Sequence, residues 1–362
     1  MTKTKCYLGL EDGTVFAGES FGASGTSVGE VVFNTAMSGY QEILTDPSYC
    51  GQIVTMTMPQ MGNYGVNAED MESSKQHLSG FVVKELSRRY SNHRATGSLH
   101  EFLQSAGIIG LAGVDTRTLT KRLRERGALR GVISTEIGDP AQLVAKARAA
   151  RPMEGQNLVE QVRPDGERVF SAEGGSGDLS VVAMDCGIKS NILRELAAAG
   201  CRVRVVPPSA SAEQILSTNP RGLLVGNGPG DPAAVTDAVA TIRQLVGRLP
   251  IFGICLGHQL LSLALGAKTY KLKFGHHGAN HPVLNAETGR VEITSQNHGF
   301  AVDIPSLEAI GGRVTHINLY DRSLEGFAHP ENRVFAVQYH PEAAPGPHDS
   351  GYLFDQFVGM LK

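Results

Sequence analysis

A single cysteine lies between two glycines in the segment GICLG, residues 253–257. The apolar run PIFGIC before it is typical of a buried strand, and LGHQLLSLALG after it is typical of a helix. A tight strand-to-helix turn exposes the side chain at its centre and needs small neighbours. The free N–H groups at the start of the helix would stabilise a thiolate and a tetrahedral oxyanion. This context favours Cys255 as a nucleophile over the alternative, a buried cysteine packed between glycines.

The segment QYHPE, residues 338–342, supplies a base for such a nucleophile. It follows an apolar strand pattern, and in an extended chain His340 and Glu342 point to the same side. Pro341 stiffens the pair and keeps the residue before it extended. We therefore expect Glu342 to orient the imidazole of His340 while the other ring nitrogen faces Cys255.

A glycine-rich loop follows another apolar strand pattern in LLVGNGPGDP, residues 223–232. Its three glycines leave backbone N–H groups open to an oxyanion or to a substrate carboxylate. The loop matches neither the G-x-x-x-x-G-K-[ST] pattern nor G-x-G-x-x-G. It therefore does not indicate a phosphate or dinucleotide site.

Alternating strand and helix patterns must position these three segments. Four β-α units follow residue 180, and their apolar strands predict a mostly parallel sheet flanked by helices. Ligands bind such sheets at the carboxyl ends of the strands, where Cys255 lies. Residues 1–150 predict a separate N-terminal domain of mixed α/β structure. The stretch 151–179, rich in Gly, Ser and charge, predicts a linker to a second domain at 180–362.

The composition is that of an ordinary globular protein, with 41% hydrophobic and 19% charged residues among 362. A net charge of −3 gives no electrostatic support for binding nucleic acid or an anionic membrane. No apolar run approaches the roughly 18 residues of a membrane span, and the N-terminus lacks the apolar core of a secretory signal. We therefore expect a cytoplasmic protein. Five widely spaced cysteines without a C-x-x-C pair predict neither a disulfide framework nor a zinc ribbon.

Together the motifs GNGPGDP, GICLGHQLL and QYHPE resemble those of the class I (triad) glutamine amidotransferases, over residues 180–360. In that family a cysteine attacks the side-chain amide of glutamine, a histidine transfers protons, and a glutamyl thioester is hydrolysed to glutamate. The resemblance implies that Cys255 is the nucleophile, His340 the base and Glu342 its orienting partner.

The rest of the chain is similar to the small (glutaminase) subunits of carbamoyl phosphate synthetases. The similar segments are GEVVFNTAMSGYQEILTDPSYCGQIVTMTMPQMGNYG, KFGHHGANHPV, TSQNHGFAV and PGPHDS. This resemblance implies that ammonia passes to a separate large subunit in a heterodimer. The large subunit would bind ATP and Mg and make carbamoyl phosphate for arginine and pyrimidine biosynthesis, so we expect no cofactor in this chain.

The same resemblance implies a pocket for L-glutamine. Ser48 would reach the substrate from the N-terminal domain, and Gly228 and Gly230 would bind it and help form the oxyanion hole. The other residues implied by the resemblance are the N–H of Leu256 beside the nucleophile, Gln259, Asn297, Gly299 and Phe300.

Two other patterns could indicate different sites. His276, His277 and His281 lie close together in the sequence, with His258 and His298 as potential neighbours, and histidines bind zinc. Their H-H-x-x-x-H spacing lies in a Gly-rich stretch without a cysteine or carboxylate to complete a tetrahedron, so we expect no metal site. The basic segment RTLTKRLRERG predicts a solvated or partner-facing helix rather than a nucleic-acid contact.

Two alternatives stay open at this point. The chain could be the glutaminase subunit of another synthase or a peptidase-like cysteine hydrolase, although the N-terminal half argues against both. It could also be a non-catalytic subunit that stabilises a partner. The intact trio Cys255, His340 and Glu342 argues against that second alternative.

Overall fold

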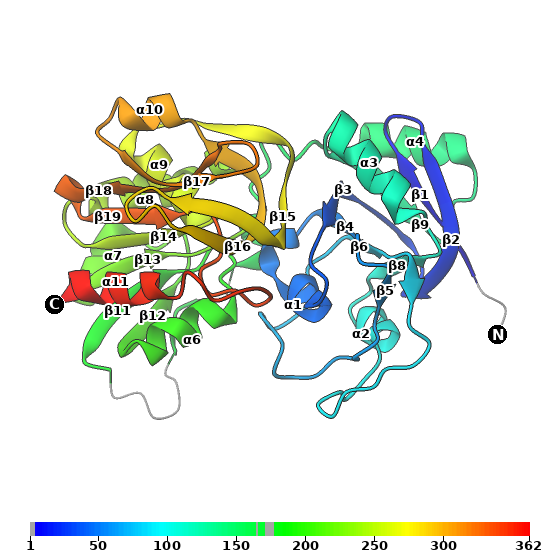
Figure 1. Cartoon of the computed structure of the whole chain (residues 1–362), viewed down its shortest axis with the longest axis horizontal. Helices are drawn as coiled ribbons and strands as arrows, with labels where there is room; N and C mark the ends of the chain where they lie inside the picture. The colour runs from blue at the N-terminus through cyan, green and yellow to red at the C-terminus, as the bar shows by residue number, and fades with distance from the viewer. Residues whose placement is uncertain (1–3, 164–165, 171–176) are drawn as a thin grey trace. The chain divides into compact units, whose positions relative to one another are not determined.

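The computed structural model describes residues 4–163, 166–170 and 177–362, which form two compact units (Figure 1). The N-terminal unit comprises Met1–Glu154 and Lys273–Gly278, and the C-terminal unit comprises Gly155–Leu272 and Ala279–Lys362. Strand β15 (Thr269–Asn285) therefore supplies residues to both units. The sequence patterns did not indicate this return of the chain to the N-terminal unit, because they report only local structure.

A closed β-barrel forms the N-terminal unit, with strand order β1-β2-β8-β6-β4-β3-β9. Strands β1 and β2 form a hairpin, and Gly13 in its turn has a φ of 99°, which residues with a Cβ rarely adopt. Apolar side chains such as Leu8, Val31 and Leu111 fill the core. The barrel strands are β1 (Lys5–Leu10), β2 (Val15–Gly22), β3 (Thr26–Asn34), β4 (Gln52–Met56), β6 (Gly80–Val82), β8 (Ile109–Ala112) and β9 (Leu129–Ser134). A two-stranded ribbon is formed by β5 (Gln60–Met61) and β7 (Glu85–Leu86).

Short helices connect these strands, and their first residues follow the capping rules. Ser98 and Glu101 form a capping box at the start of α2 (Leu99–Ser105). Asp115 caps α3 (Thr116–Arg126), the basic helix. The remaining helices of this unit are α1 (Tyr40–Thr45), the 3-10 turn η1 (Pro47–Tyr49) and α4 (Pro140–Ala149).

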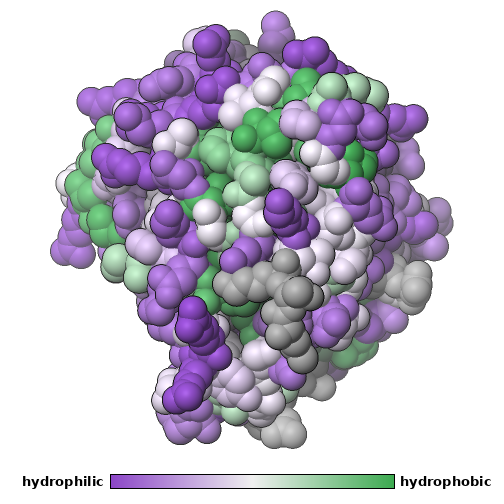
Figure 2. Space-filling model, turned by 90° about the vertical axis from the view of Figure 1, so that its right-hand side faces the viewer, coloured by the Kyte–Doolittle hydropathy of each residue, from purple (hydrophilic) through white to green (hydrophobic). Residues whose placement is uncertain are grey.

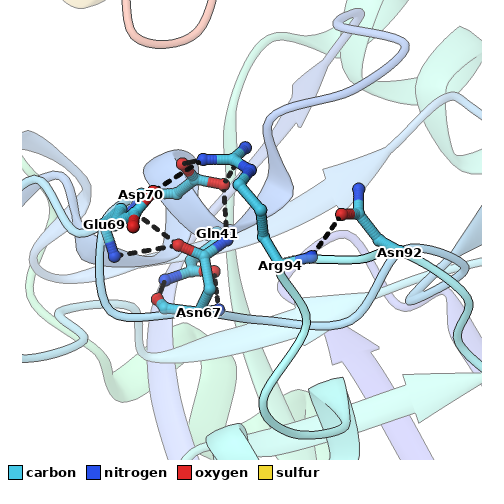
Figure 3. A network of polar contacts seen from close by, with 6 residues as sticks. All are labelled: Gln41, Asn67, Glu69, Asp70, Asn92 and Arg94. Atoms are coloured by element: carbon cyan, nitrogen blue, oxygen red, sulfur yellow. Dashed lines mark hydrogen bonds and ion pairs between the residues drawn. The ribbon is translucent and has the colours of Figure 1, made fainter.

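A polar network holds the long loops of the N-terminal unit beside helix α1 (Figure 3). Both guanidinium nitrogens of Arg94 donate to the carboxylate of Asp70, over 2.9 and 3.1 Å. Asp70 also accepts from the side-chain amide of Asn67, whose backbone N–H donates to Gln41 of α1 over 2.9 Å. The network thus ties residues 67–70 and residues 92–94 to one helix.

A ten-stranded sheet forms the centre of the C-terminal unit, in the order β10-β12-β11-β13-β14-β19-β18-β17-β15-β16. The five strands β12, β11, β13, β14 and β19 run parallel, as the β-α pattern predicts. Strand β18 pairs with β19 in the antiparallel sense and begins an antiparallel extension. The strands are β10 (Arg168–Phe170), β11 (Leu179–Met184), β12 (Cys201–Val206), β13 (Gly222–Val225), β14 (Ile251–Ile254), β16 (Val291–Val302), β17 (Arg313–Asn318), β18 (Leu324–His329) and β19 (Val334–Val337).

Helices cover both faces of the parallel part of the sheet (Figure 1). Alternate residues of β11 show the division, because Val182 packs with α7, α8 and α9, whereas Val181 packs with α6 and α11. Burial on both faces explains why these strands are continuous apolar runs. The helices are α5 (Val159–Val162), α6 (Ser190–Ala198), α7 (Ala212–Ser217), α8 (Thr236–Leu245), α9 (Leu256–Leu265), α10 (Ile304–Glu308) and α11 (Tyr352–Leu361), with the 3-10 turns η2 (Pro232–Ala234) and η3 (Pro330–Asn332).

The segment 151–179, predicted as a linker, contains regular structure in its described part. It includes α5 and the edge strand β10, which pairs with β12. Val159 of α5 packs into the core of the C-terminal unit, so tertiary contacts stabilise a segment whose own pattern is weak. Residues 164–165 and 171–176 of this stretch lie outside the described residues.

Hydrophilic side chains predominate on the face of the molecule shown in Figure 2, and hydrophobic ones lie in patches between them. This distribution is ordinary for a protein with 19% charged residues. Every helix in the described part of the chain is too short or too polar to span a bilayer.

Candidate active site

Cys255 lies at the turn between β14 and α9. Its backbone has a φ of 55° and a ψ of −106°, a conformation that is costly for any residue with a Cβ. Gly257 on its helical side is required for space, since a Cβ there would lie 2.0 Å from the carbonyl oxygen of Val225. The thiol is buried and donates to the backbone carbonyl of Asn297 over 3.6 Å. The strained turn that the GICLG segment predicts is therefore present.

His340 and Glu342 follow β19, and both side chains are buried. Nδ1 of His340 lies 2.6 Å from Oε1 of Glu342. Because the carboxylate accepts, Nδ1 carries the proton of this bond. Nε2 is buried and has no hydrogen-bond partner within the part of the chain that the structure describes. The backbone N–H of His340 donates to Ser295 of β16 over 2.9 Å, which fixes the turn to the neighbouring strand.

Lys189 is a buried partner of this pair that the sequence analysis missed. It precedes α6, and its ammonium group donates to Oε1 of Glu342 over 3.0 Å and to the carbonyl of Ala343 over 2.5 Å. Its own backbone N–H donates to the side chain of Asn227 in the glycine-rich loop, over 3.0 Å. A signal was present, because the segment MDCGIKSN places Lys189 after a parallel strand that ends on the same edge of the sheet as β14.

The charges of this cluster shift two pKa values in opposite directions. Burial is the largest single effect on His340 and disfavours its imidazolium form, but the charge of Glu342 and the interactions with Cys255 together outweigh burial and raise the pKa of His340 to about 10. Lys189 opposes that rise, and the charge of Cys255 adds to it. Burial disfavours the carboxylate of Glu342 as well, yet Lys189 and His340 lower the pKa of Glu342 to about 2. The site therefore holds an imidazolium beside the thiol, oriented by a carboxylate.

Two glycines of the predicted pocket are places of close backbone approach. A Cβ at Gly228 would lie 2.2 Å from the carbonyl oxygen of Cys186 and 2.9 Å from the side chain of Leu256. Gly230 has a φ of 92°, and a Cβ there would lie 2.6 Å from the carbonyl oxygen of Gln156. The glycine-rich loop thus lies against the start of α9, as the oxyanion-hole prediction requires.

Gln259 lies one turn along α9 from the cysteine and is buried. Its amide nitrogen donates to the carbonyl of Phe300 over 2.9 Å and to the side chain of Gln338 over 3.0 Å. Asn297 and Phe300 are both on β16, so this strand contacts the cysteine turn and the Gln259 side chain. Gly299 between them is partly exposed, and a Cβ there would lie 2.8 Å from Nζ of Lys271.

Comparisons with known proteins decide the family. Residues 8–133 match the model described as "Carbamoyl-phosphate synthase small chain, CPSase domain", and residues 182–360 match "Glutamine amidotransferase class-I". The carbamoyl phosphate synthase small chain of Chlorobaculum tepidum is 54% identical, and the alignment covers 100% of this chain and 99% of that protein. The small chain of Rhodopirellula baltica is also 54% identical, with coverage of 98% of this chain and 95% of that protein.

The chain belongs to the carbamoyl phosphate synthase small chain family. The chain is also similar to a solved glutamine amidotransferase from Thermotoga maritima, which is 16% identical with a TM-score of 0.37, covering 45% of this chain and 76% of that one. Family membership confirms a glutamine amidotransferase-type enzyme subunit with an N-terminal small-chain domain. It also confirms the predicted fold class of two α/β domains.

Three other cysteines and Ser48 complete the description of the chain. Cys186 is fully buried, and burial raises the pKa of its thiol. Burial also raises the pKa of the Cys6 and Cys201 thiols, in each case to about 11. Ser48 belongs to the N-terminal unit, where Asp46 caps its backbone N–H over 2.9 Å, and its contact with glutamine stays a prediction.

Proposed function

We propose that this small chain hydrolyses L-glutamine to glutamate and ammonia through a Cys255–His340–Glu342 triad. The observation that carries the proposal is the cysteine at a strained strand-to-helix turn, in the same buried cluster as a histidine whose Nδ1 is bonded to a carboxylate. A packing cysteine has no need of a strained backbone, and strain of this kind is concentrated at functional sites.

The first half of the reaction forms a thioester. The thiolate of Cys255 attacks the side-chain amide carbon of glutamine, and the C=O electrons move onto oxygen. Backbone N–H groups of Leu256 and of the Gly228–Gly230 loop stabilise that oxyanion. The imidazolium of His340 gives its Nε2 proton to the amide nitrogen, the C–N bond breaks, and ammonia leaves.

The second half restores the enzyme. A water molecule attacks the thioester carbon while the neutral imidazole of His340 takes its proton. The C–S bond breaks, glutamate leaves, and the thiolate of Cys255 again faces the imidazolium. Glu342 stays deprotonated throughout. When His340 is neutral, Glu342 holds it in the tautomer that is protonated at Nδ1 and unprotonated at Nε2.

The pocket residues orient the substrate in this scheme. Gln259 meets the backbone groups of glutamine, and Asn297, Gly299 and Phe300 complete the pocket wall. Ser48 reaches the substrate from the N-terminal domain. The support for these roles is the match of each residue to the pattern of the family, together with the contacts that join Gln259 to Phe300.

The partner in this proposal is a large synthetase subunit. The name of the relatives, small chain, supports a second chain that receives the ammonia. That chain would bind ATP and Mg and make carbamoyl phosphate for arginine and pyrimidine biosynthesis. The small chain itself would need no cofactor.

The decisive experiment is glutamate release by the purified chain and its Cys255→Ser variant, each with and without the large subunit. We expect the wild type to release glutamate, the large subunit with ATP and bicarbonate to accelerate it, and the variant to lose at least about 1,000-fold in both settings. Cys201→Ser, which changes a buried thiol on β12, is the matched control and should retain turnover.

Wild-type turnover by Cys255→Ser would overturn the mechanism. Inert wild-type protein in the presence of the large subunit would instead favour the non-catalytic alternative, a subunit that only stabilises its partner.

A further inference from the structure

A second buried carboxylate, Glu292, lies beside the turn that carries His340. It is on β16 and 8% exposed. Its Oε1 accepts from Asn285 Nδ2 over 3.2 Å and from the Tyr352 hydroxyl over 2.9 Å. Its Oε2 accepts from the Tyr339 hydroxyl over 3.3 Å and from Ser350 Oγ over 2.8 Å. Four donors from three segments of the chain converge on this one carboxylate, so all of its hydrogen bonds are supplied by groups that the fold positions around it.

The donors come from both ends of the catalytic turn. Tyr339 directly precedes His340 and is fully buried. Its hydroxyl donates to Glu292 and so connects the residue before His340 to β16. Ser350 and Tyr352 lie at the start of α11, where the segment that follows Glu342 ends. A single carboxylate thus joins the chain before His340 to the chain after Glu342.

Strand β16 holds the active site at two further points. The carbonyl of Ser295 accepts from the backbone N–H of His340 over 2.9 Å, and the carbonyl of Asn297 accepts from the thiol of Cys255. Glu292, Ser295 and Asn297 therefore place the tyrosine, the base and the nucleophile against one strand. A shift of β16 relative to this turn changes the approach of the imidazole to the thiol.

The turn itself requires an external frame. Ala343 and Ala344, directly after Glu342, have φ values of 57° and 52°. Residues with a Cβ stay in this region only where their surroundings over-determine it. The Glu292 cluster supplies such surroundings at the far end of the segment, since Ser350 and Tyr352 bind it directly.

One neighbour of the cluster is titratable and stays neutral. The ring of His316 packs edge-on against Tyr339 at 5.7 Å, and its Nε2 lies 3.4 Å from the Tyr352 hydroxyl. Burial lowers the pKa of His316 in spite of the charge of Glu292. The carboxylate of Glu292 therefore holds its neighbours through the hydrogen bonds that it accepts from hydroxyl and amide groups, and not through an ion pair with His316.

We propose that Glu292 is a positioning residue for glutamine hydrolysis, which holds the Tyr339–Ser350 segment so that Nε2 of His340 faces the thiol of Cys255. The inference rests on the proposed function, since it assigns a role within the same site. It assigns Glu292 no contact with the substrate.

The test compares Glu292→Gln with Glu287→Gln in the full chain. Both remove one carboxylate, but Glu287 is exposed and its side chain pairs with Arg313. We expect Glu292→Gln to lower kcat about 10-fold with KM for glutamine unchanged within about twofold, and Glu287→Gln to change neither. Alkylation of Cys255 by iodoacetamide, measured against pH, should follow a different profile in Glu292→Gln only.

A double-variant cycle separates positioning from general destabilisation. Tyr339→Phe removes one hydroxyl and should lower kcat about threefold, and the double variant should be no slower than Glu292→Gln alone, because both changes break one connection. Thermal melts identify a variant that does not fold. If Glu292→Gln fails to fold, Tyr339→Phe and Ser350→Ala decide the question.

The outcomes keep this inference apart from the proposed function. Loss of glutamine hydrolysis in the wild type overturns the proposed function, yet the alkylation profiles still test Glu292. Unchanged kcat and an unchanged alkylation profile in a folded Glu292→Gln or Tyr339→Phe variant overturn the positioning role.

Discussion

Each unit uses a cation to tie separate segments together, but the two cations lie in different environments. The side chain of Arg94 in the N-terminal unit is 43% exposed and donates two hydrogen bonds to the carboxylate of Asp70. Lys189 of the C-terminal unit is 3% exposed and binds Glu342, whose side chain is fully buried. The same kind of contact is therefore a loop anchor in one unit and part of the proposed reaction centre in the other.

The difference shows why burial decides the function of an ion pair. Water screens an exposed pair, so its contribution is small and its partners keep nearly ordinary chemistry. Burial strengthens each interaction and makes each missing partner costly. Burial of the cluster therefore allows its charges to hold the pKa values of His340 and Glu342 far from their usual ranges.

Among substitutions of the buried ion pair, Glu342→Gln should have the largest effect on catalysis. The amide keeps the size of the side chain but removes the charge that raises the pKa of His340. The alkaline limb of the kcat/KM profile should move to lower pH, and kcat should fall about 100-fold or more, since the proposed mechanism then loses the imidazolium that protonates the leaving ammonia. Initial rates between pH 6 and 10.5 measure both the position of the alkaline limb and kcat.

The same substitution should change the stability of the fold in a way that depends on pH. The pKa of Glu342 falls from its ordinary 4.5 to about 2 on folding, so the carboxylate stabilises the fold above pH 4.5. That contribution is lost as the pH drops from 4.5 toward 2. The difference in denaturation midpoint between wild type and Glu342→Gln should therefore narrow across this range, and a constant difference would contradict the assigned ion pair.

Much of the C-terminal unit could be predicted from the sequence, because its signals are local. The parallel strands, the cysteine turn and the His-Pro-Glu segment each lie within a run of about ten residues, and strand-to-helix periodicity identifies them. In the N-terminal unit, the capping box at Ser98 and the hairpin turn at Gly13 likewise depend on local residue types.

The contacts that the sequence analysis missed all join distant segments. Lys189 and Glu342 are 153 residues apart, and Glu292 and Ser350 are 58 apart. The closed barrel and the return of residues 273–278 to the N-terminal unit also depend on pairing between distant strands. The strand pattern indicates at most the sheet edge at which a residue such as Lys189 lies, and tertiary packing alone determines which distant residues become partners.

Lys189→Met should have the next largest effect, and its signature should be stability rather than rate. Methionine fills the volume but removes the ammonium donor to the carbonyl of Ala343 and to the buried carboxylate of Glu342, which then relies on its hydrogen bond from His340. Breaking a buried pair from one side costs about 3–5 kcal/mol. We expect a loss of this order in urea unfolding, with kcat lowered about 10-fold because Glu342 orients His340 less well.

The matched control for this substitution is Lys268→Met, which changes an exposed lysine of the same unit. It should leave both the unfolding free energy and kcat near the wild-type values. Equal effects from the two lysine variants would remove the distinction between buried and exposed cations in this unit.

Arg94→Ala should have the smallest effect, and this outcome would complete the comparison. The substitution removes the two-point bond to Asp70 in the network that Figure 3 shows, but water can solvate the carboxylate in its place. We expect the melting temperature to fall by no more than about 3 °C, with kcat unchanged and with the difference reduced in 1 M salt. Hydrogen exchange of residues 67–72 should quicken, because the loop loses its anchor while the barrel does not. A large loss of kcat in Arg94→Ala would mean that the exposed anchor also serves the reaction, and burial alone would then no longer separate the two kinds of ion pair.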